Sequence, residues 1–461
     1  MIEQLNPWVR GKRVLILGFG REGRSTWTVL KELGTCACLD VADQREIPFE
    51  EGMGKRFSGP DYQKVLNNYD VIFKSPGIVL QEPPEKLSCE ILSQTQVFFS
   101  LFRDRIVGIT GTKGKSTVTS LMYHILKTAG RDVLIMGNIG IPAFDHLEEI
   151  GPRTLIVFEL SCHQLEYMTV SPHIALLINL YEEHLDHYGT MERYVLAKEQ
   201  IFRHQRAEDF LVCNVQCRPK PGTCFSKVIL AGMDRPDLEL DLEAEESLEQ
   251  KREQGKKKWP QINFRGSLYE IPADQIHLIG LHNYFDIAMV YGACRLLGVE
   301  DEAFTQGLKT YHPLPHRLQF VGERGGVRYF DDSISTICDT AIQALKTLKD
   351  VDTVLIGGMD RGIDYRELIH FLSEHPVPHI ILMEATGKRI FREIQEQEPD
   401  FRGKDRLVLA DHLEDAVREA KKLTRPGRSC LLSPAAASYG IFRNFEERGE
   451  VFARLALSDE S

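Results

Sequence analysis

Short apolar runs rich in β-branched residues alternate along the chain with longer segments of helical periodicity. Near its start this pattern predicts strands at Arg13–Leu17, Cys36–Leu39 and Val71–Phe73 and a helix at Ser25–Leu33. Strands separated by helices lie parallel in one sheet, because each helix returns the chain to the edge where the previous strand began. The pattern therefore predicts a parallel α/β domain over residues 1–98.

The same alternation begins twice more along the chain. The middle is expected to form strands at Arg105–Ile109, Thr154–Phe158 and Ile174–Ile178 and helices at Ser116–Thr128 and Asn283–Leu297. The remainder is expected to form strands at Arg328–Phe330, Thr353–Ile356, His379–Leu382 and Ser429–Leu432. We therefore expect a second domain over residues 99–311 and a third over residues 312–461, which makes the fold class α/β with three consecutive domains.

One long stretch, residues 218–262, is polar and breaks this alternation. Within it Leu238–Lys258 is acidic and then basic, which is more typical of a solvated surface excursion than of a binding tail. The sequence does not indicate what this stretch does.

Composition and charge narrow the class of protein. The 461 residues exceed what one hydrophobic core accommodates, and the net charge of -11 argues against nucleic-acid binding. No apolar run reaches the roughly 18 residues of a membrane-spanning helix, and the residues before the first predicted strand lack the apolar stretch and cleavage site typical of a signal peptide. The ten cysteines show no paired spacing, as is expected of reduced thiols that form no disulfides. We expect a cytoplasmic protein with no membrane insertion.

A segment rich in glycine and lysine lies between a predicted strand and a predicted helix. It comprises Gly111, Thr112, Lys113, Gly114, Lys115, Ser116 and Thr117. Glycines let backbone N–H groups turn towards phosphate oxygens, and the helix N-terminus that follows favours their negative charge. Lys115 is expected to reach the β- and γ-phosphates of ATP, and the Ser116 hydroxyl to bind Mg²⁺. A strict Walker A motif has glycine where this chain has Ile109.

A carboxylate directly follows one of the predicted central strands. Glu159 comes after the apolar run Leu155–Phe158, and nucleotide sites are built where parallel strands end. Because Mg²⁺ prefers oxygen ligands, Glu159 is a candidate ligand for the ion that accompanies ATP.

A second glycine-rich turn follows the first predicted strand. Gly18, Gly20 and Gly23 have the spacing of a dinucleotide-binding fingerprint, and Asp40 is expected to end the next strand. Taken alone, these residues suggest a nicotinamide-dependent oxidoreductase. Such an enzyme would not need the separate ATP loop, which argues against this interpretation. The oxidoreductase therefore stays as the alternative to an ATP-using enzyme.

Several stretches, taken in chain order, resemble the MurD branch of the Mur ligases. The ATP loop has the Thr-Gly-Thr-x-Gly-Lys-Ser form of that family. Glu159–Glu166 is similar to its Glu-Leu-Ser-Ser-x-Gln-Leu stretch, and Asn179–Asp186 to its Asn-x-x-x-Asp-His-Leu/Met-Asp stretch. Leu432–Ser438 and Phe442–Gly449 resemble its C-terminal signature. The resemblance implies a Rossmann-like N-terminal domain, a central P-loop ATPase-like domain and a Rossmann-like C-terminal domain.

The activity that the resemblance implies is ATP-dependent joining of a carboxylate to an amine through an acyl-phosphate. The implied substrates are ATP, UDP-N-acetylmuramoyl-L-alanine and glutamate, and the protein is expected to be a monomer. The UDP-sugar is expected to contact Gly18, Gly20, Gly23, Asp40, Ser75 and Gly77, with Asn138 at the muramoyl part. The implied contacts with the nucleotide are Asn283, Asp286, Arg317 and Asp332, with Asp286 standing where the family has asparagine.

The same resemblance extends the predicted metal site. It implies that His184 binds Mg²⁺ together with Ser116 and Glu159. It also implies that Lys198 carries a carbamate, which turns a cation into a carboxylate-like ligand; the residue alone would be taken for a solvated helix lysine. The resemblance thus makes Lys115, His184 and Lys198 the expected catalytic residues.

Departures from the family pattern fall where the glutamate is expected to bind. The implied contacts are Thr336, Arg361, Ser438 and Phe445. Family members that add D-glutamate have lysine and asparagine where this chain has Ile334 and Ile337, and lysine at the Arg361 position. Arginine binds a carboxylate through two nitrogens where lysine is a point charge, so the exchange is not neutral. The pattern favours a subgroup that adds L-glutamate, with the D-glutamate enzyme as the alternative.

Two other ligases share parts of this pattern. A folylpolyglutamate synthase has the ATP loop but no domain of the Gly18–Gly23 type in front of it. Another Mur ligase is disfavoured, because Glu159–Glu166 and Ser433–Gly449 match the MurD branch best.

Overall fold

The computed structural model describes residues 1–139, 141–183, 185–233, 237–241, 260–278, 281–313, 315–375, 377–398 and 401–458. The chain falls into two compact units, which we describe separately. The first unit consists of Met1–His277 with His282–Tyr311, and the second of Leu278–Leu281 with His312–Ser461. Among the described residues, no helix is both long and apolar enough to cross a membrane.

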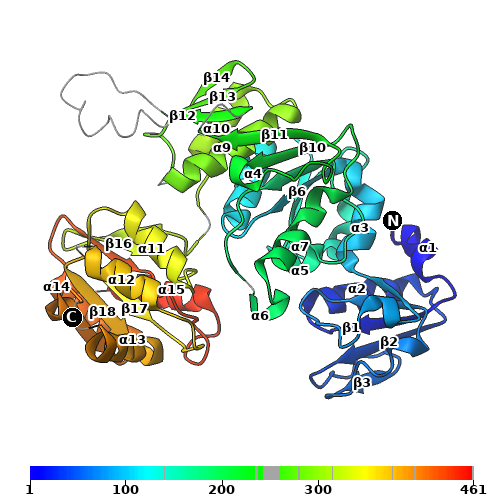
Figure 1. Ribbon diagram of the computed structural model, residues 1–461, viewed down its shortest axis with the longest axis horizontal. Helices are drawn as coiled ribbons and strands as arrows, with labels where there is room; N and C mark the ends of the chain where they lie inside the picture. The colour runs from blue at the N-terminus through cyan, green and yellow to red at the C-terminus, as the bar shows by residue number, and fades with distance from the viewer. Residues whose placement is uncertain are drawn as a thin grey trace. The chain divides into compact units, whose positions relative to one another are not determined.

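The first unit begins with a parallel five-stranded sheet in the order β3-β2-β1-β4-β5, of which β1, β2 and β3 are labelled in Figure 1. Its strands are β1 (Arg13–Leu17), β2 (Cys38–Asp43), β3 (Arg56–Ser58), β4 (Val71–Lys74) and β5 (Glu90–Leu92). Short helices η1 (Ile2–Leu5) and α1 (Asn6–Val9) precede the sheet, α2 (Arg21–Leu33) follows β1, and α3 (Gln94–Phe102) follows β5. The predicted parallel α/β arrangement is confirmed for this part of the chain.

Two boundaries in this sheet differ from the prediction. Helix α2 starts at Arg21, four residues before the expected Ser25, because it begins inside the glycine-rich turn. Strand β2 runs on to Asp43, because the buried pair Val41-Ala42 continues its apolar run. The prediction that Asp40 ends this strand is therefore wrong.

The second sheet of this unit has nine strands in the order β14-β13-β12-β11-β10-β9-β6-β8-β7. They are β6 (Ile106–Thr110), β7 (Val133–Gly137), β8 (Leu155–Glu159), β9 (Ile174–Leu177), β10 (Phe210–Asn214), β11 (Lys227–Gly232), β12 (Leu238–Asp241), β13 (Gln261–Phe264) and β14 (Ser267–Glu270). Its principal helices are α4 (Lys115–Thr128), α7 (Met191–Arg203), α9 (Leu281–Leu296) and α10 (Asp301–Thr310). Strand β6 pairs with β8 on one side and β9 on the other, both parallel. The carboxyl ends of these three strands therefore meet at one edge of the sheet.

The polar stretch at residues 218–262 contributes strands to this sheet. β11 runs parallel to β10, and β12 pairs with β11 on one edge and β13 on the other. Leu238 and Leu240 of β12 are buried, so the start of Leu238–Lys258 is not a solvated excursion. Residues 242–258 of that excursion lie outside the described part of the chain. The strands were missed because each is only four to six residues long, too short to stand out in a polar stretch.

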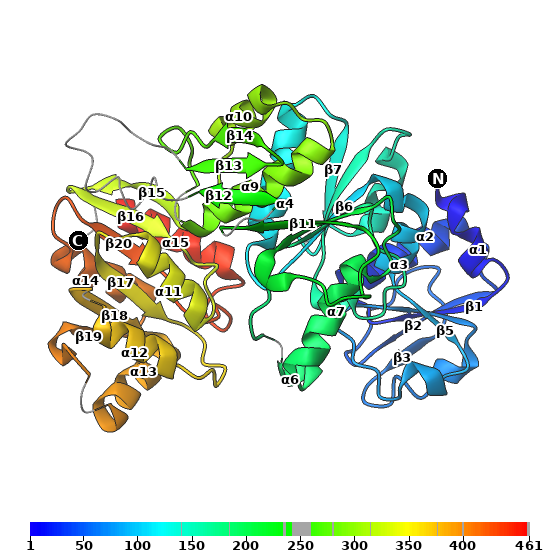
Figure 2. The same ribbon diagram turned by 45° about the horizontal axis from the view of Figure 1, so that its top comes forward.

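The second unit contains a six-stranded sheet in the order β15-β16-β20-β17-β18-β19 (Figure 2). Its strands are β15 (Gln319–Arg324), β16 (Val327–Asp331), β17 (Val351–Gly357), β18 (His379–Met383), β19 (Leu407–Ala410) and β20 (Ser429–Leu432). The helices are α11 (Cys338–Thr347), α12 (Arg366–Glu374), α13 (Glu384–Gln397), α14 (Leu413–Leu423) and α15 (Phe445–Leu457). Only β15 is antiparallel to its neighbour among these pairings.

Helices cover both faces of this sheet. One hydrophobic cluster joins α11, α12 and α13 to residues such as Val354 and Ile356 of β17. A second cluster joins α14 and α15 to Leu355 of the same strand. Alternate residues of one strand thus belong to two cores, as expected when helices flank a parallel sheet.

Candidate functional site

The phosphate-binding loop lies between the end of β6 and the start of α4. Gly114 precedes the helix with a φ of +83°, a left-handed conformation that glycine adopts without strain. Lys115 donates from Nζ to the carbonyl oxygens of Gly111 at 3.0 Å and Thr112 at 2.9 Å. Burial lowers the pKa of Lys115, while the charges of Glu159 and Glu183 act in the opposite direction. The Lys115 ammonium group therefore binds carbonyl oxygens of the phosphate loop and lies near the carboxylates of Glu159 and Glu183.

The segment after β9 holds this loop in place. The backbone N–H of Lys113 donates to Asn179 Oδ1 at 2.9 Å, and Asn179 Nδ2 donates back to the carbonyl of Lys113 at 3.1 Å. Lys113 Nζ forms an ion pair with Glu183 at 2.8 Å. Both residues belong to Asn179–Asp186, the stretch that resembles the Mur motif: Asn179 is its first residue, and Glu183 lies near its end. Their role as supports of the loop was not predicted, although the motif contained them.

The loop also contacts helix α7. The Thr112 hydroxyl lies 2.9 Å from the Tyr194 hydroxyl and accepts a hydrogen bond from the backbone N–H of Tyr181 at 2.9 Å. One helical turn after Tyr194, the Lys198 side chain points to the same place. Thr112 is therefore fixed from two directions.

Glu159 lies at the end of β8 with one oxygen engaged and one available. Its Oε1 accepts a hydrogen bond from Asn138 Nδ2 at 2.7 Å, and its backbone carbonyl accepts one from the Asn138 N–H at 2.9 Å. Its Oε2 is buried and has no hydrogen-bond partner among the described residues. An unpaired buried carboxylate oxygen is costly, so this atom is suited to a cation.

Lys198 is the most deeply placed cationic side chain near the loop. It is 1% exposed, and Nζ donates to the Gly111 carbonyl at 2.8 Å. Burial, and next the charge of Lys115, lower the pKa of Lys198 to about 7. The lysine is therefore not solvated, and near neutral pH its amine is partly uncharged and nucleophilic.

The structure describes three of the four predicted metal residues. Ser116 is in the first turn of α4, Glu159 ends β8 and Lys198 lies on α7. His184 lies outside the described residues. A hydroxyl, an unpaired carboxylate oxygen and a carbamate would form the oxygen-rich set that Mg²⁺ prefers, so these residues fit the ion. Lys198 as a free amine does not belong to such a set.

The glycine-rich turn after β1 is shaped by close packing. A Cβ at Gly23 would lie 2.0 Å from the Gly18 carbonyl oxygen, and Ser75 Oγ donates to that same oxygen at 2.8 Å. No heavy atom of the described chain lies within 4 Å of a Cβ built at Gly20 or at Gly77. The turn therefore has two tightly packed glycines, Gly18 and Gly23, while Gly20 and, after β4, Gly77 border open space where a ligand can approach the backbone.

Asp43, and not Asp40, is the carboxylate at the glycine-rich turn. Asp43 Oδ2 accepts a hydrogen bond from the Phe19 N–H at 2.7 Å. Asp40 is buried within β2, where it accepts from the Tyr69 hydroxyl and the Lys55 N–H, each at 2.7 Å. Both oxygens of Asp40 thus have protein partners. The sequence contained Asp43, but the early end assigned to β2 hid it.

Glu22 was not predicted as a site residue, because it stands at a variable position of the glycine-rich turn. It lines a cavity together with Gln94, Asn138, Gln164 and other residues of this unit. Its Oε1 is buried without a hydrogen-bond partner in the described chain. Burial raises the pKa of Glu22 to about 7, against the opposing hydrogen bond with Gln164 and the charge of Lys74. Glu22 is therefore a polar group available to whatever fills the cavity.

Asn283 and Asp286 lie near the start of α9 and are buried. A Cβ at Gly114 would lie 3.1 Å from both carboxylate oxygens of Asp286. Helix α9 therefore begins directly beside the phosphate loop, which is the position expected of a nucleotide contact.

In the second unit, the predicted residues lie on loops that follow the strands. Arg361 Nη2 donates to the Thr336 carbonyl at 3.1 Å, and the Met359 N–H donates to the Ala437 carbonyl at 2.8 Å, next to Ser438. Thr336, Arg361 and Ser438 thus belong to three connected loops. Phe445 begins α15, and its carbonyl accepts from the Ser333 hydroxyl at 2.8 Å.

Asp332 is buried, and so is one side-chain nitrogen of the half-buried Arg317. Burial raises the pKa of Asp332 to about 6, while hydrogen bonds with Ser335 and Ser433 lower it. Asp332 Oδ2 accepts from the Ser433 hydroxyl at 2.7 Å, and Oδ1 accepts from the Leu318 N–H at 3.2 Å. Arg317 Nε is buried with no partner in the described part of the chain. Asp332 therefore also supports its loop.

Arg448 is a structural centre of this unit that sequence reasoning missed. It is fully buried and donates to the Ser333 hydroxyl at 2.9 Å, the Ser333 carbonyl at 2.9 Å and the Ala436 carbonyl at 3.0 Å. It joins the loops after β16 and β20. The sequence could have pointed to Arg448, because it lies in Phe442–Gly449, the stretch that resembles the C-terminal signature of the family.

Comparisons with known proteins agree with this geometry. Residues 109–294 match the Mur ligase middle domain family. UDP-N-acetylmuramoylalanine–D-glutamate ligases of Pelotomaculum thermopropionicum and Geobacillus kaustophilus are 31% and 32% identical to the chain. The alignments cover 97% and 96% of this chain and 98% and 96% of the relatives.

Solved structures of similar fold are more distant in sequence. The MurF ligase of Thermotoga maritima in complex with ADP is 18% identical, with a TM-score of 0.58 over 98% of this chain and 96% of that one. The MurC ligase of Thermotoga maritima is 17% identical, with a TM-score of 0.56 over 96% and 98%. At these identities the likeness concerns the fold, and it agrees with the expected three α/β domains.

Proposed function

Because this chain belongs to the family of UDP-N-acetylmuramoylalanine–D-glutamate ligases, we propose that it uses ATP to join glutamate to UDP-N-acetylmuramoyl-L-alanine. It is an ATP-dependent ligase that forms an amide bond. The observation that carries the proposal is the group formed by Lys115, Glu159 and Lys198 at the ends of β6 and β8. It combines a phosphate-binding loop with an unpaired carboxylate oxygen.

The reaction proceeds in two steps, formation of an acyl-phosphate and then formation of the amide bond. The alanine carboxylate attacks the γ-phosphorus of ATP, the bond to the bridging oxygen breaks, and ADP leaves with that electron pair. The glutamate amine then attacks the acyl-phosphate carbonyl carbon, loses a proton and expels inorganic phosphate. Lys115 moves from the loop carbonyls to the phosphate oxygens and spreads their developing charge. Mg²⁺, when bound, neutralises phosphate charge and would be held by Ser116, Glu159, His184 and carbamylated Lys198.

We assign residues 1–98 to the UDP-sugar, 99–311 to ATP and 312–461 to glutamate. The open space over Gly20 and Gly77 supports contact with the diphosphate, with Asp43 replacing Asp40 as the carboxylate at the turn. Asn138 reaches the muramoyl part while it orients Glu159. Asn283 and Asp286 bind adenine, and Arg317 with Asp332 bind the phosphates and ribose. We place the enzyme in the cytoplasm, as a monomer.

The handedness of the glutamate has two candidates. The relatives carry D-glutamate in their names, which favours D-glutamate over the L-glutamate expected from the sequence. The case for L-glutamate is the sequence alone: Ile334, Ile337 and Arg361 stand where the D-glutamate branch has lysine, asparagine and lysine. In the structure Arg361 donates to the Thr336 carbonyl. A carboxylate clamp built on that arginine differs from one built on a lysine.

One experiment tests the activity and the handedness together. Phosphate release from ATP is measured with UDP-N-acetylmuramoyl-L-alanine and either D- or L-glutamate. We expect release with one enantiomer and none without the UDP-sugar. A nicotinamide-dependent oxidoreductase would bind reduced cofactor and release no phosphate.

A variant of the phosphate loop ties the activity to the proposed site. Lys115→Ala is expected to lower the rate of phosphate release at least about 100-fold, the loss typical when a charge-stabilising group is removed. Lys127→Ala, an exposed lysine on the same helix, is the matched control and should keep the full rate. Full turnover by a folded Lys115→Ala enzyme contradicts the assignment.

A further inference from the structure

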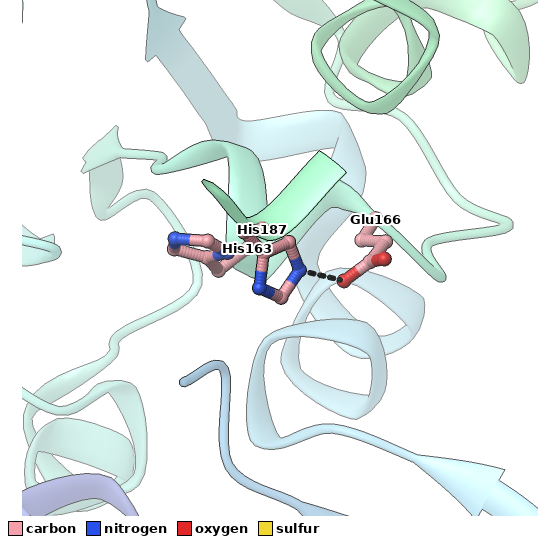
Figure 3. A group of neighbouring side chains, drawn as sticks. All are labelled: His163, Glu166 and His187. Atoms are coloured by element: carbon pink, nitrogen blue, oxygen red, sulfur yellow. Dashed lines mark hydrogen bonds and ion pairs between the residues drawn. The ribbon is translucent and has the colours of Figure 1, made fainter. Parts of the chain in front are cut away.

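Two histidines and a glutamate gather outside the ATP site. The ligand atoms of His163, Glu166 and His187 all lie within 4.8 Å of one another. Figure 3 shows them grouped where two segments meet, with the contact between His187 and Glu166 drawn as a dashed line. His163 and Glu166 come from the segment after β8, and His187 from the segment after β9. Neither the phosphate loop nor the proposed reaction uses these residues.

We propose that His163, Glu166 and His187 form a second metal site, which binds a transition-metal ion of the Zn²⁺ class. Two imidazoles and one carboxylate are the donor set of three-ligand zinc sites, with a water in the fourth position. Mg²⁺ prefers oxygen donors and suits such a set poorly. The site therefore differs in metal preference from the one at Glu159.

The geometry is close to that of a formed site. His187 Nε2 and Glu166 Oε2 are 3.4 Å apart, which matches the roughly 3.3 Å between neighbouring ligands of a tetrahedral ion with bonds of about 2.0 Å. The rings of His163 and His187 meet edge to face, with centroids 4.4 Å apart. The ligand atom of His163 lies within 4.8 Å of the other two, so reaching the spacing of a tetrahedral ion requires it to come closer by at most about 1.5 Å.

The backbone holds two of the ligands in advance. Helix α5 (Cys162–Leu165) begins with a capping box in which Ser161 and Gln164 exchange hydrogen bonds. His163 and Glu166 are three residues apart at this turn, so their side chains share one face. His187 lies on the short helix α6 (Leu185–Tyr188). A preformed pair of ligands reduces the ordering that metal binding requires.

The site has both an entry path and partial shelter from water. His163 lines a cavity with Lys74, Gln164 and Tyr167, while the side chains of His187 and Glu166 are 13% and 21% exposed. An ion bound there would connect the segments that follow β8 and β9. The first segment directly follows Glu159 and the second holds the phosphate loop through Asn179, so the ion would stabilise the region around the ATP site.

Cobalt titration of the whole chain tests this proposal. Metal-free protein in excess Mg²⁺ is titrated with Co²⁺, whose four-coordinate complexes absorb visible light far more strongly than six-coordinate ones. We expect one equivalent to give the strong spectrum, and Zn²⁺ to displace it and raise the melting temperature. His163→Gln, Glu166→Gln and His187→Gln should each lose the spectrum or weaken binding by more than the 10–100-fold typical of an outer partner.

His146→Gln is the matched control. His146 forms a pair with Glu149 three residues away at 2.7 Å, and the described residues supply no second histidine to that pair. It should keep the cobalt spectrum. Circular dichroism without metal checks that each variant is folded. A wild-type chain without the strong spectrum, or folded ligand variants that retain it, would overturn the proposal; phosphate release is measured separately and does not enter this test.

Discussion

At the scale of single residues, burial decides what the charged groups near the ATP loop can do. The sequence pointed to Lys115 through the phosphate loop and to Glu159 through the end of a strand, and the family resemblance pointed to Lys198. The sequence did not indicate that Lys198 is 1% exposed or that one oxygen of Glu159 lacks a partner in the described chain. Both facts depend on strands that lie far apart in the sequence, so neither can be inferred from local pattern.

Lys198 is expected to form a carbamate. Its pKa is lowered to about 7, first by burial, so the neutral amine that attacks carbon dioxide becomes dominant as the pH rises above 7. With carbon-13-labelled bicarbonate at about pH 8, the wild-type chain should show a carbamate resonance by NMR. Lys198→Met should lose that resonance and Lys127→Met should keep it. Its persistence in Lys198→Met would disprove the modification.

Glu22 is expected to make the fold less stable as the pH rises. Burial raises the pKa of Glu22 from 4.5 to about 7, so between these values the folded chain keeps a proton that the unfolded chain has lost. The free energy of unfolding therefore falls through this window. Glu22→Gln should be more stable than wild type by roughly 1–3 kcal/mol above pH 7 and equal to it below about pH 4.5.

Chemical denaturation across the pH range measures this difference. Glu32→Gln on the exposed face of the same helix controls for the loss of one carboxylate. If wild type and Glu22→Gln respond identically to pH, Glu22 is not a buried acid of this kind.

At the scale of elements, the sequence predicted the existence of strands better than their ends. Ser429–Leu432 is identical to β20, and the strands next to the ATP loop differ by one residue at their bounds. Apolar β-branched runs identify buried strands well, since such strands are covered on both faces. The ends failed where tertiary contacts extend a strand, as at Asp43, and short strands failed within the polar stretch.

The glycine-rich turn offers a test at this scale. Gly23→Ala should lower the free energy of unfolding by about 1–3 kcal/mol, because its Cβ would meet the Gly18 carbonyl oxygen at 2.0 Å and the backbone would have to shift. Gly20→Ala is the control, since its φ of -77° suits any residue and its Cβ would meet no described atom within 4 Å. Denaturant midpoints compare the two, and equal midpoints would contradict the packing argument.

At the scale of the whole molecule, the two compact units differ in how fully the sequence anticipated them. The start of the third predicted domain, residue 312, is also where the second unit resumes. The first unit holds two sheets that were predicted as separate domains. Which substrate each part binds came from the family resemblance, because a parallel α/β sheet supports many functions.

The second unit is expected to fold when expressed alone. Its sheet has a hydrophobic core on each face, which is what an independent domain requires. A fragment of residues 312–461 should show one cooperative unfolding transition and helical circular dichroism. The full chain is the reference. A fragment that unfolds gradually with denaturant would show that its cores depend on the first unit.

Strand β6 has a consequence for how the protein is synthesised. Its two partners, β8 and β9, follow it in the chain by dozens of residues, while β7, the next strand made, lies beyond β8. On the ribosome, β6 therefore waits with both edges unpaired until its partners emerge. Unpaired apolar edges attract other chains. The strand that carries the ATP loop is thus one of the edges that a nascent chain has to keep from other chains until β8 and β9 have been made.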